Sequence, residues 1–363
     1  MNRTKKGTFE VLSVSGGRDH TLALLATGKV FGWGGDGSGR IASDAPEYCS
    51  TRAAQPGAVQ VVLDRPLVSI AAGHGVSLAI TASDTVAVWG ANAAGIGGRR
   101  EAIALATPQR VADLADVRAI AAGEFLFGAI DRAGTVHTWG LNRDGALGRR
   151  TATLNEGPGI VGALPPATRL AVGKGCMLAL TRDGEVYGWG DNAAGQLGLG
   201  HLDSVAAPRP LAVNAKVRSI AAGATHALAV TVDGTAWAWG SNHRGQLGSR
   251  DLAYAAKPVP VELPEPIRSV AAGMHFSLAL SEAGNVYAWG WNAHGQLGLN
   301  DTMDRRNAAR VGGLEHVRAI AAGETHAVAL TSGAMWGWGN NGAGQIGPAR
   351  PRQLQPAVII SLG

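Results

Sequence analysis

Short stretches in which large apolar residues alternate with small ones recur along the whole chain. In residues 276–281 every second side chain is large and apolar, and in residues 286–290 Tyr287 and Trp289 share one parity. A period of two residues is typical of β-strands that bury one face. The intervening Glu-Ala-Gly-Asn at 282–285 has the composition of a hairpin turn. The pattern predicts two antiparallel strands joined by a tight turn.

The same unit occurs seven times, as two sequence marks show. A Trp-Gly pair recurs at Trp33, Trp89, Trp139, Trp189, Trp239, Trp289 and Trp338. A glycine that ends the apolar segment before each alternating run, here called the marker glycine, recurs at Gly17, Gly73, Gly123, Gly173, Gly223, Gly273 and Gly323. Both marks step by 49 to 56 residues. Two marks in one register indicate seven copies of one structural unit.

Each repeat has room for about four short strands, which is the content of a propeller blade. A longer connection rich in Pro and Val follows most Trp-Gly runs, as in 258–261, and proline restricts such a segment to an edge strand. We therefore predict an all-β fold, a seven-bladed β-propeller of four-stranded antiparallel blades. It forms one domain over residues 9–363, after a flexible tail at 1–8.

Closure of the ring is predicted from the two ends of the chain. The first repeat begins at residues 9–11 without a preceding Pro-Val strand, whereas the chain ends in Pro-Ala-Val-Ile-Ile at 356–360. We expect this last segment to complete the first blade, so that the N- and C-terminal strands share a blade and leave no open edge.

Composition and charge narrow the class of protein. With 46% hydrophobic residues and 10 Trp the chain is too apolar to be disordered. Its net charge is +5, but the basic residues are scattered, so we do not expect nucleic-acid binding. No apolar stretch predicts a signal peptide or a membrane span. Cys49 and Cys176 have no ligand or disulfide-framework spacing, which favours a cytoplasmic protein, although a secreted protein with a trimmed leader would look the same.

Two stretches carry a family resemblance. They read GATHALAVTVDGTAWAWGSNHRGQLG at 223–248 and GETHAVALTSGAMWGWGNNGAGQIG at 323–347. The pattern resembles the regulator of chromosome condensation repeat family, and the repeats match it over roughly residues 9–347. That family includes a nuclear exchange factor for a small GTPase that also binds chromatin, ubiquitin-ligase and signalling modules, and a bacterial secreted β-lactamase inhibitor. The repeats keep a nearly constant length with no inserted wedge, so the chain looks most like the small bacterial members.

Residues that recur in every blade are interpreted as structural. The Trp of each Trp-Gly pair is expected to pack between blades. The asparagine that follows most Trp-Gly pairs by two positions is expected to hydrogen-bond its own turn. His20, His226 and His326 recur at one repeat position, which favours satisfied core histidines over a catalytic role. No nucleophile, phosphate-binding or metal-ligand motif is present, so we predict no catalytic residues, no cofactor and no metal site.

Function is expected where the repeat varies. The two positions after the marker glycine differ between blades, and they predict a partner-binding loop ring that includes Arg18, Asp19, His74, Glu124, Phe125, Lys174, Met274, His275 and Glu324. Trp291 is aromatic at a position that is small or polar after the other Trp-Gly pairs, apart from Leu141, which makes it the best hot-spot candidate. Packing of Trp291 against its neighbour's connection is an equally weighted alternative.

A second candidate surface is basic. It consists of Arg118, Arg218, Arg268 and Arg318 at identical repeat positions, with Arg169 displaced by one. These arginines either form a positive ring toward an acidic partner or, as their repetition favours, cap carbonyls of neighbouring blades.

The sequence favours a monomeric, non-catalytic protein-protein interaction propeller that binds a protein partner through its variable loops. Three alternatives stay open: a guanine nucleotide exchange factor or effector acting on a small GTPase, a secreted β-lactamase-inhibitor-like protein, and an enzyme with a site in the central channel.

Overall fold

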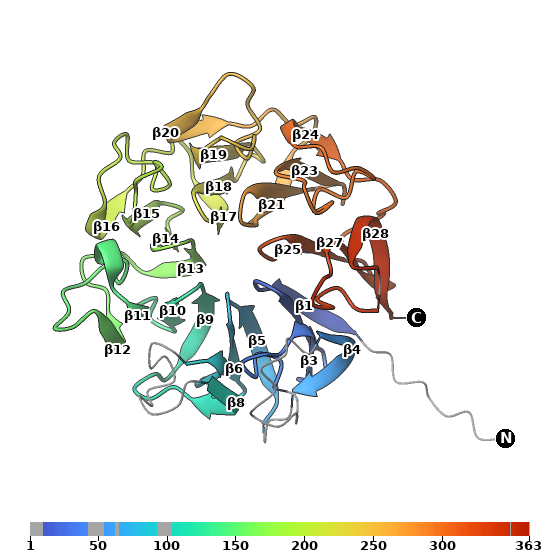
Figure 1. Ribbon diagram of the computed structural model, residues 1–363. Helices are drawn as coiled ribbons and strands as arrows, with labels where there is room; N and C mark the ends of the chain where they lie inside the picture. Colours follow the sequence, from blue (N-terminus) through green and yellow to red (C-terminus); the bar gives the residue numbers. More distant parts are fainter. Residues whose placement is uncertain (1–9, 43–53, 62–64, 93–103, 349, 363) are drawn as a thin grey trace.

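The computed structural model describes residues 10–42, 54–61, 65–92, 104–348 and 350–362, and these form seven four-stranded antiparallel sheets. The sheets stand around a common axis, each with one edge toward the centre (Figure 1). The predicted seven-bladed all-β propeller is therefore confirmed. The proposed tail at 1–8 lies outside the described residues, as does Cys49.

Strands of the same rank occupy the same radius in every blade. The innermost strands are β1 (Val11–Gly16), β5 (Leu67–Ala72), β9 (Val117–Ala122), β13 (Ala167–Val172), β17 (Val217–Ala222), β21 (Ile267–Ala272) and β25 (Ala319–Ala322). The second strands are β2 (His20–Leu25), β6 (Val76–Thr81), β10 (Leu126–Asp131), β14 (Cys176–Thr181), β18 (His226–Thr231), β22 (Phe276–Ser281) and β26 (His326–Leu330). The third strands are β3 (Val30–Gly35), β7 (Val86–Ala91), β11 (Val136–Leu141), β15 (Val186–Gly190), β19 (Ala236–Ser241), β23 (Val286–Gly290) and β27 (Ala334–Asn340). The outer strands are β4 (Ala54–Val61), β8 (Ala104–Arg110), β12 (Asn155–Ile160), β16 (Val205–Pro210), β20 (Tyr254–Pro260), β24 (Arg305–Arg310) and β28 (Arg352–Ser361). One short 3-10 turn, η1 (Arg143–Gly145), is the only helical element in the described part of the chain.

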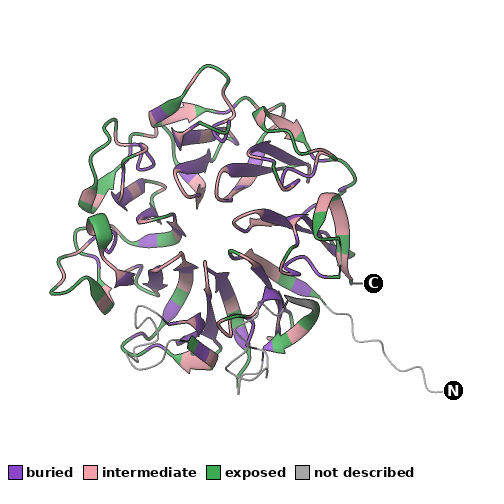
Figure 2. Ribbon diagram, viewed as in Figure 1, coloured by how far each residue is buried: buried purple, intermediate pink, exposed green. Residues whose placement is uncertain are grey.

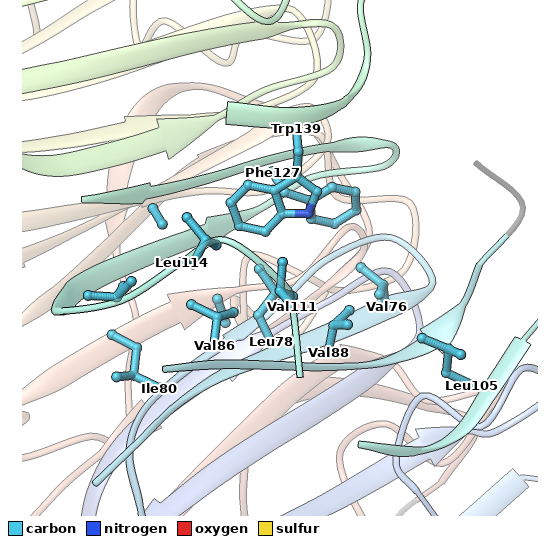
Figure 3. Packing of buried hydrophobic residues seen from close by; sticks show 13 residues of the cluster. Val76, Leu78, Ile80, Val86, Val88, Leu105, Val111, Leu114, Phe127 and Trp139 are labelled. Carbon is cyan, nitrogen blue, oxygen red and sulfur yellow. The ribbon is translucent and has the colours of Figure 1, made fainter. Parts of the chain in front are cut away.

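The core lies between neighbouring blades. The middle strands are almost wholly buried, whereas the outer strands expose much of their length (Figure 2). Between blades 2 and 3, Phe127 and Trp139 of blade 3 pack against Val76, Leu78 and Val88 of blade 2 (Figure 3). The second strands bury both faces, and every residue of β22 is buried. The alternation in residues 276–281 therefore separates large from small buried side chains, and not a buried face from an exposed one.

The tryptophan of every Trp-Gly pair packs against the preceding blade. The indoles that also donate a hydrogen bond to that blade include Trp189, Trp239, Trp289 and Trp338, whereas those of Trp89 and Trp139 find no acceptor among the described residues. All seven tryptophans are at most 2% exposed, which confirms the packing interpretation. The Trp289 indole N–H donates to the backbone oxygen of Gln246 in blade 5, at 2.8 Å. The glycine that follows has a positive φ, 99° at Gly290, which an L side chain rarely adopts. The pair therefore combines an interblade contact with a backbone bend.

The marker glycine allows the blades to approach closely at the axis. A Cβ on Gly73 would lie 2.5 Å from the carbonyl oxygen of Gly123 in the next blade. A Cβ on Gly17 would be equally close to the oxygen of Gly73. Such distances are too short for any side chain, so the inner edge of the ring requires glycine at this position.

The predicted shared blade is wrong. The C-terminal strand β28 pairs with β27 in the seventh blade, and β1 begins a complete first blade that ends in β4. The Pro-rich segment after each Trp-Gly run returns as the outer strand of its own blade, as Pro260 opposite Trp237 shows. The first blade therefore has all four of its strands without the C-terminal segment. The ring closes by contacts between complete blades, including a hydrogen bond from the Glu324 amide to the oxygen of Gly17 at 3.0 Å.

Candidate functional site

The two ends of the ring carry different connections. Because strands alternate in direction, the turns between first and second strands and the loops between third and outer strands open on one end, here called the loop face. The turns between second and third strands and the links between blades lie at the other end, here called the connection face. Each of the two candidate surfaces from the sequence falls on one of these faces.

The loop ring lies on one face, as predicted, and it surrounds the mouth of the central channel. A cavity of about 280 Å³ is lined by the inner strand ends and the first turns of all seven blades. The residue after each marker glycine lines this cavity, and the seven are Arg18, His74, Glu124, Lys174, Ala224, Met274 and Glu324. The scaffold thus repeats sevenfold while the side chains at its mouth do not.

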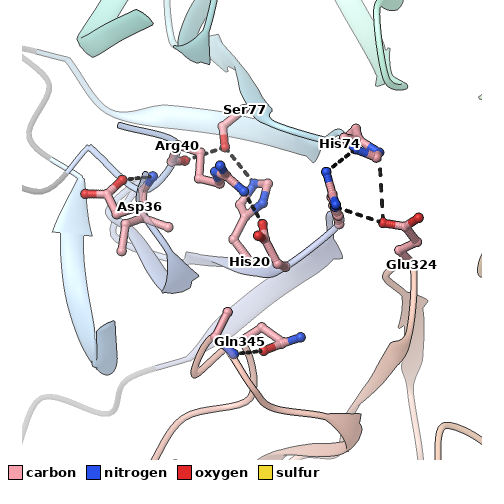
Figure 4. A network of polar contacts seen from close by, with 11 residues as sticks. His20, Asp36, Arg40, His74, Ser77, Glu324 and Gln345 are labelled. Carbon is pink, nitrogen blue, oxygen red and sulfur yellow. Dashed lines mark hydrogen bonds and ion pairs between the residues drawn. The ribbon is translucent and has the colours of Figure 1, made fainter. Parts of the chain in front are cut away.

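A polar network at the mouth links blades 1, 2 and 7. Arg18 donates to the Nε2 atom of His74 at 2.7 Å and lies 3.4 Å from the Glu324 carboxylate. His74 lies 3.9 Å from the same carboxylate, so Glu324 faces both side chains (Figure 4). Burial, and then the Arg18 charge, lower the pKa of His74, while Glu324 opposes this shift. His74 is therefore neutral at pH 7 and accepts the arginine N–H.

Asp19 belongs to the internal structure of blade 1. Its carboxylate is ion paired with Arg40. The backbone oxygen of Arg40 accepts a hydrogen bond from Ser77 of blade 2 at 2.7 Å (Figure 4). Of the predicted loop residues, Asp19 is thus tied to this blade contact, whereas Lys174 is exposed at the mouth.

Trp291 and His275 come together on the loop face. Their ring centroids lie 6.2 Å apart, and the Trp291 ring centroid also lies 5.2 Å from that of His294 in the same loop. His275 in turn meets His243 of blade 5 at 4.8 Å. Burial, and then the charges of His243 and nearby cations, lower the pKa of His275 to about 4. The structure thus adds His243 and His294, which the sequence had not singled out.

Phe125 is partly a core residue and partly a residue of the loop face. It packs against the core between blades 2 and 3, and its backbone oxygen accepts the amide of Leu141 at 2.7 Å. Part of its ring therefore supports the blade, which makes Phe125 a weaker contact candidate than Trp291. Met274 and Glu124 are half-buried at the channel mouth.

The arginine ring lies on the connection face, away from the loop ring. Arg268 donates to the backbone oxygens of Val317 at 3.2 Å and Arg318 at 2.8 Å in the next blade. Arg318 donates to the oxygen of Val11 at 2.7 Å, and Arg218 makes the same kind of bond to blade 6. These three side chains cap neighbouring carbonyls, which is the structural alternative that their repetition favoured.

Arg118 departs from this arrangement. It lies 3.7 Å from the Asp84 carboxylate of the preceding blade, where Arg132 also pairs. The displaced Arg169 is exposed. The five arginines therefore do not form one uniform positive ring.

The repeated histidines are buried and neutral. Ser77 donates to the oxygen of Arg40, so the 3.0 Å contact with His20 requires His20 to donate from Nε2. The Nδ1 atom of His20 then keeps a lone pair, and it has no hydrogen-bond partner among the described residues. Burial lowers the pKa of His226 to about 3 and that of His326 to about 4. These rings are structural, as expected, but only one nitrogen of each is satisfied.

The other candidate for reactive chemistry among the described residues is a thiol. The Cys176 thiol is buried, and burial raises its pKa to about 12, which leaves it protonated at neutral pH. Within residues 10–42, 54–61, 65–92, 104–348 and 350–362, no three His, Cys, Asp or Glu side chains converge as metal ligands would. The described part of the chain also has no helix long and apolar enough to cross a membrane.

The fold and the loop ring define a repeat propeller, and sequence comparison defines its family. The family described as RCC1-like domain matches residues 104–362, and the Regulator of chromosome condensation (RCC1) repeat matches residues 11–40. The chain belongs to the RCC1-like domain family.

Two curated relatives share only part of their length with this chain. The human Probable E3 ubiquitin-protein ligase HERC6 is 32% identical over 112 residues, 30% of this chain and 11% of that protein. The BTB/POZ domain-containing protein 1 of Schizosaccharomyces pombe is 31% identical over 107 residues, 29% of this chain and 8% of that protein. Each alignment thus spans about a tenth of its relative.

Solved structures resemble the whole ring. Human WBSCR16 superposes with a TM-score of 0.81 and 26% identity, covering 92% of this chain and 94% of that chain. Prp20p from Saccharomyces cerevisiae gives a TM-score of 0.79 and 24% identity, covering 88% and 82%. Prp20p has binding properties toward Gsp1p and histones.

Proposed function

We propose that this protein is a non-catalytic interaction module that holds a protein partner on its loop face. One observation carries the proposal: the mouth of the channel varies between blades while everything that supports it repeats. Arg18, Lys174 and Met274 occupy equivalent positions with different chemistry, on turns fixed by identical marker glycines. A surface of this kind presents a rigid and asymmetric set of side chains, which suits specific binding.

A structural neighbour also supports a function in protein binding. Prp20p, which shares this ring architecture, binds proteins. The connection face offers less for binding, since Arg268 and Arg318 are engaged with backbone oxygens of the ring itself.

Photo-crosslinking tests which face binds. A benzoylphenylalanine placed at Lys174 samples the loop face, and the same group at Lys216 samples the connection face; both lysines are exposed. Illumination in lysate of the source cells is expected to give a discrete protein adduct from position 174. A discrete adduct from position 216 alone would move the binding surface to the other end of the ring.

A second candidate is exchange activity on a small GTPase, which the family resemblance and the binding of Gsp1p by Prp20p favour. It predicts faster release of fluorescent GDP from a GTPase when the propeller is added. Unchanged release across a panel of small GTPases would leave the interaction module as the better proposal.

A further inference from the structure

An aromatic strip crosses the loop face over blades 5 and 6. It consists of His243, His275, Trp291 and His294, whose successive ring centroids are 4.8, 6.2 and 5.2 Å apart. The equivalents of Trp291 in other blades are small, polar or aliphatic, and no other blade has a histidine at the position of His275. The strip is therefore a feature of these two blades and not of the repeat.

The fold does not require the Trp291 ring. Its backbone amide donates to the oxygen of His275 at 2.9 Å, and this bond holds the loop in place. The same bond forms from Ser241 at 2.8 Å and from Asn340 at 2.9 Å in the neighbouring blades. Because serine and asparagine serve equally well, the indole adds nothing to the turn. Unlike the tryptophans of the Trp-Gly pairs, it is only half-buried.

Positive charge surrounds the strip. Lys174 and Arg244 lower the pKa of His275, and Arg352 lowers that of His294, in each case after burial. Arg244 also lowers the pKa of His243, where Asp304 is the opposing acid and lies 3.5 Å from Arg244. The imidazoles are thus neutral at pH 7. The result is an uncharged aromatic surface with cations at its inner and outer ends.

We infer that the aromatic strip is the docking site for an acidic segment of the protein partner, one that places an apolar or aromatic side chain between carboxylates. This inference rests on the proposed function and names the chemistry of its partner. Carboxylates would meet Lys174 and Arg352 at the two ends, while the apolar side chain would cover Trp291 and His275. Trp and Arg at such positions are the residues that most often dominate binding energy.

The same observations favour a peptide over a nucleic acid. A phosphate backbone needs a continuous row of cations, whereas the border here consists of separated charges. Glu124 and Glu324 lie at the channel mouth and would repel a polyanion that followed the ring. A peptide can place its few carboxylates only where the cations are.

Selection from a randomised dodecapeptide library displayed on phage tests the inference. Wild-type protein is expected to enrich peptides with Asp or Glu flanking an aromatic or aliphatic residue. Fluorescence anisotropy with the enriched peptides should then show about tenfold weaker binding to Trp291→Ala and to Lys174→Ala. Lys216→Ala, which removes one cation from the connection face, should bind as wild type does. Thermal unfolding of each variant establishes that it is folded.

Several results would overturn the inference. They are enrichment of basic or uncharged peptides, no enrichment above background, or enriched peptides that bind Trp291→Ala and Lys174→Ala as tightly as wild type. An oligouridylate that displaces the peptides and binds more tightly would make the occupant a nucleic acid. If the selection fails while the partner still crosslinks from position 174, the inference falls and the interaction function stands.

Discussion

The Nε2 atom of His326 in the last blade lies 2.9 Å from the hydroxyl oxygen of Thr21 in the first blade. The same contact joins His226 to Ser277 between blades 5 and 6, at 3.0 Å. The junction that closes the ring is therefore built like the junctions between blades 1 and 2 and between blades 5 and 6. A propeller with complete blades at both ends needs this equivalence, because no shared strand joins the ends.

The contact follows a rule around the ring. Wherever the second strand begins with histidine, the next blade offers a hydroxyl, and wherever it begins with an apolar residue, the next blade offers an apolar one. The apolar pairs are Val76 with Phe127, Leu126 with Met177, Cys176 with Ala227 and Phe276 with Ala327. The ring thus combines three polar and four apolar junctions without leaving the hydroxyl or the histidine Nε2 unmatched.

Replacement of the Thr21 hydroxyl is expected to weaken ring closure. Thr21→Val keeps the shape but leaves His326 without its partner, which should lower the free energy of unfolding by about 1–3 kcal/mol. Thr21→Ser keeps the hydroxyl and should fall closer to wild type. Urea unfolding monitored by tryptophan fluorescence measures both, and equal losses in the two variants would contradict the role of the bond.

Stability should decrease as the pH falls below about 6.5. The folded-state pKa of His226 is lowered to about 3 from an ordinary value of 6.5, so the unfolded chain gains a proton that the folded ring does not. The stabilisation is complete above pH 6.5 and is lost as the pH falls toward 3, by about 1.4 kcal/mol per pH unit for this one group.

A double variant isolates this contribution. His226→Phe with Ser277→Ala copies the apolar junction of Phe276 and Ala327, so it should reduce the slope of unfolding free energy against pH between 6.5 and 4 by about 1.4 kcal/mol per pH unit. An unchanged slope in urea titrations at several pH values would show that His226 does not carry it.

The ring could be predicted from the sequence because each blade places the same short-range requirements on the same repeat positions. Gly73 and Gly290 each satisfy a short-range requirement, a close approach and a positive φ, and such requirements leave the same residue in every blade. The assignment of strands to blades failed at the ends. A Pro-rich strand pairs with the strand before it or after it depending on the path of the loop, and alternation alone does not distinguish these paths.

Close packing at the axis predicts a sharp contrast between two glycines. Gly73→Ala would place a Cβ 2.5 Å from the oxygen of Gly123 and is expected to lower the free energy of unfolding by about 1–3 kcal/mol. Gly162→Ala has no atom within 4 Å of its new Cβ and should change stability by less than about 0.5 kcal/mol. Thermal melts of both variants provide the comparison, and similar midpoints would refute the packing argument.

Arg268 is expected to matter for the fold and not for the partner. Arg268→Ala removes two hydrogen bonds to blade 7 and should destabilise the ring by about 1 kcal/mol. Affinity for the partner, measured by isothermal titration with the folded variant, should stay at the wild-type value. A large loss of affinity with no loss of stability would restore the arginine ring as a binding surface.

The candidate site was predictable in part. The sequence predicted the loop ring because the positions after the marker glycine vary between repeats. It also predicted Trp291 as a contact residue, because an aromatic side chain is unusual at that repeat position. The sequence did not predict His243 and His294 as site residues. Each lies in a loop that joins the third and outer strands, where the repeat tolerates many residues. Only the fold brings His243 of blade 5 next to His275 of blade 6.

Affinity capture from lysate with two matched double variants tests the central claim most directly. Trp291→Ala with Lys174→Ala removes one large apolar side chain and one cation from the loop face. Val232→Ala with Lys216→Ala truncates an apolar side chain and removes a cation on the connection face, where Val232 is 60% exposed. The account predicts a protein partner that wild type and the connection-face variant retain and the folded loop-face variant loses. A partner retained equally by both variants, or lost only from the connection-face variant, would contradict it.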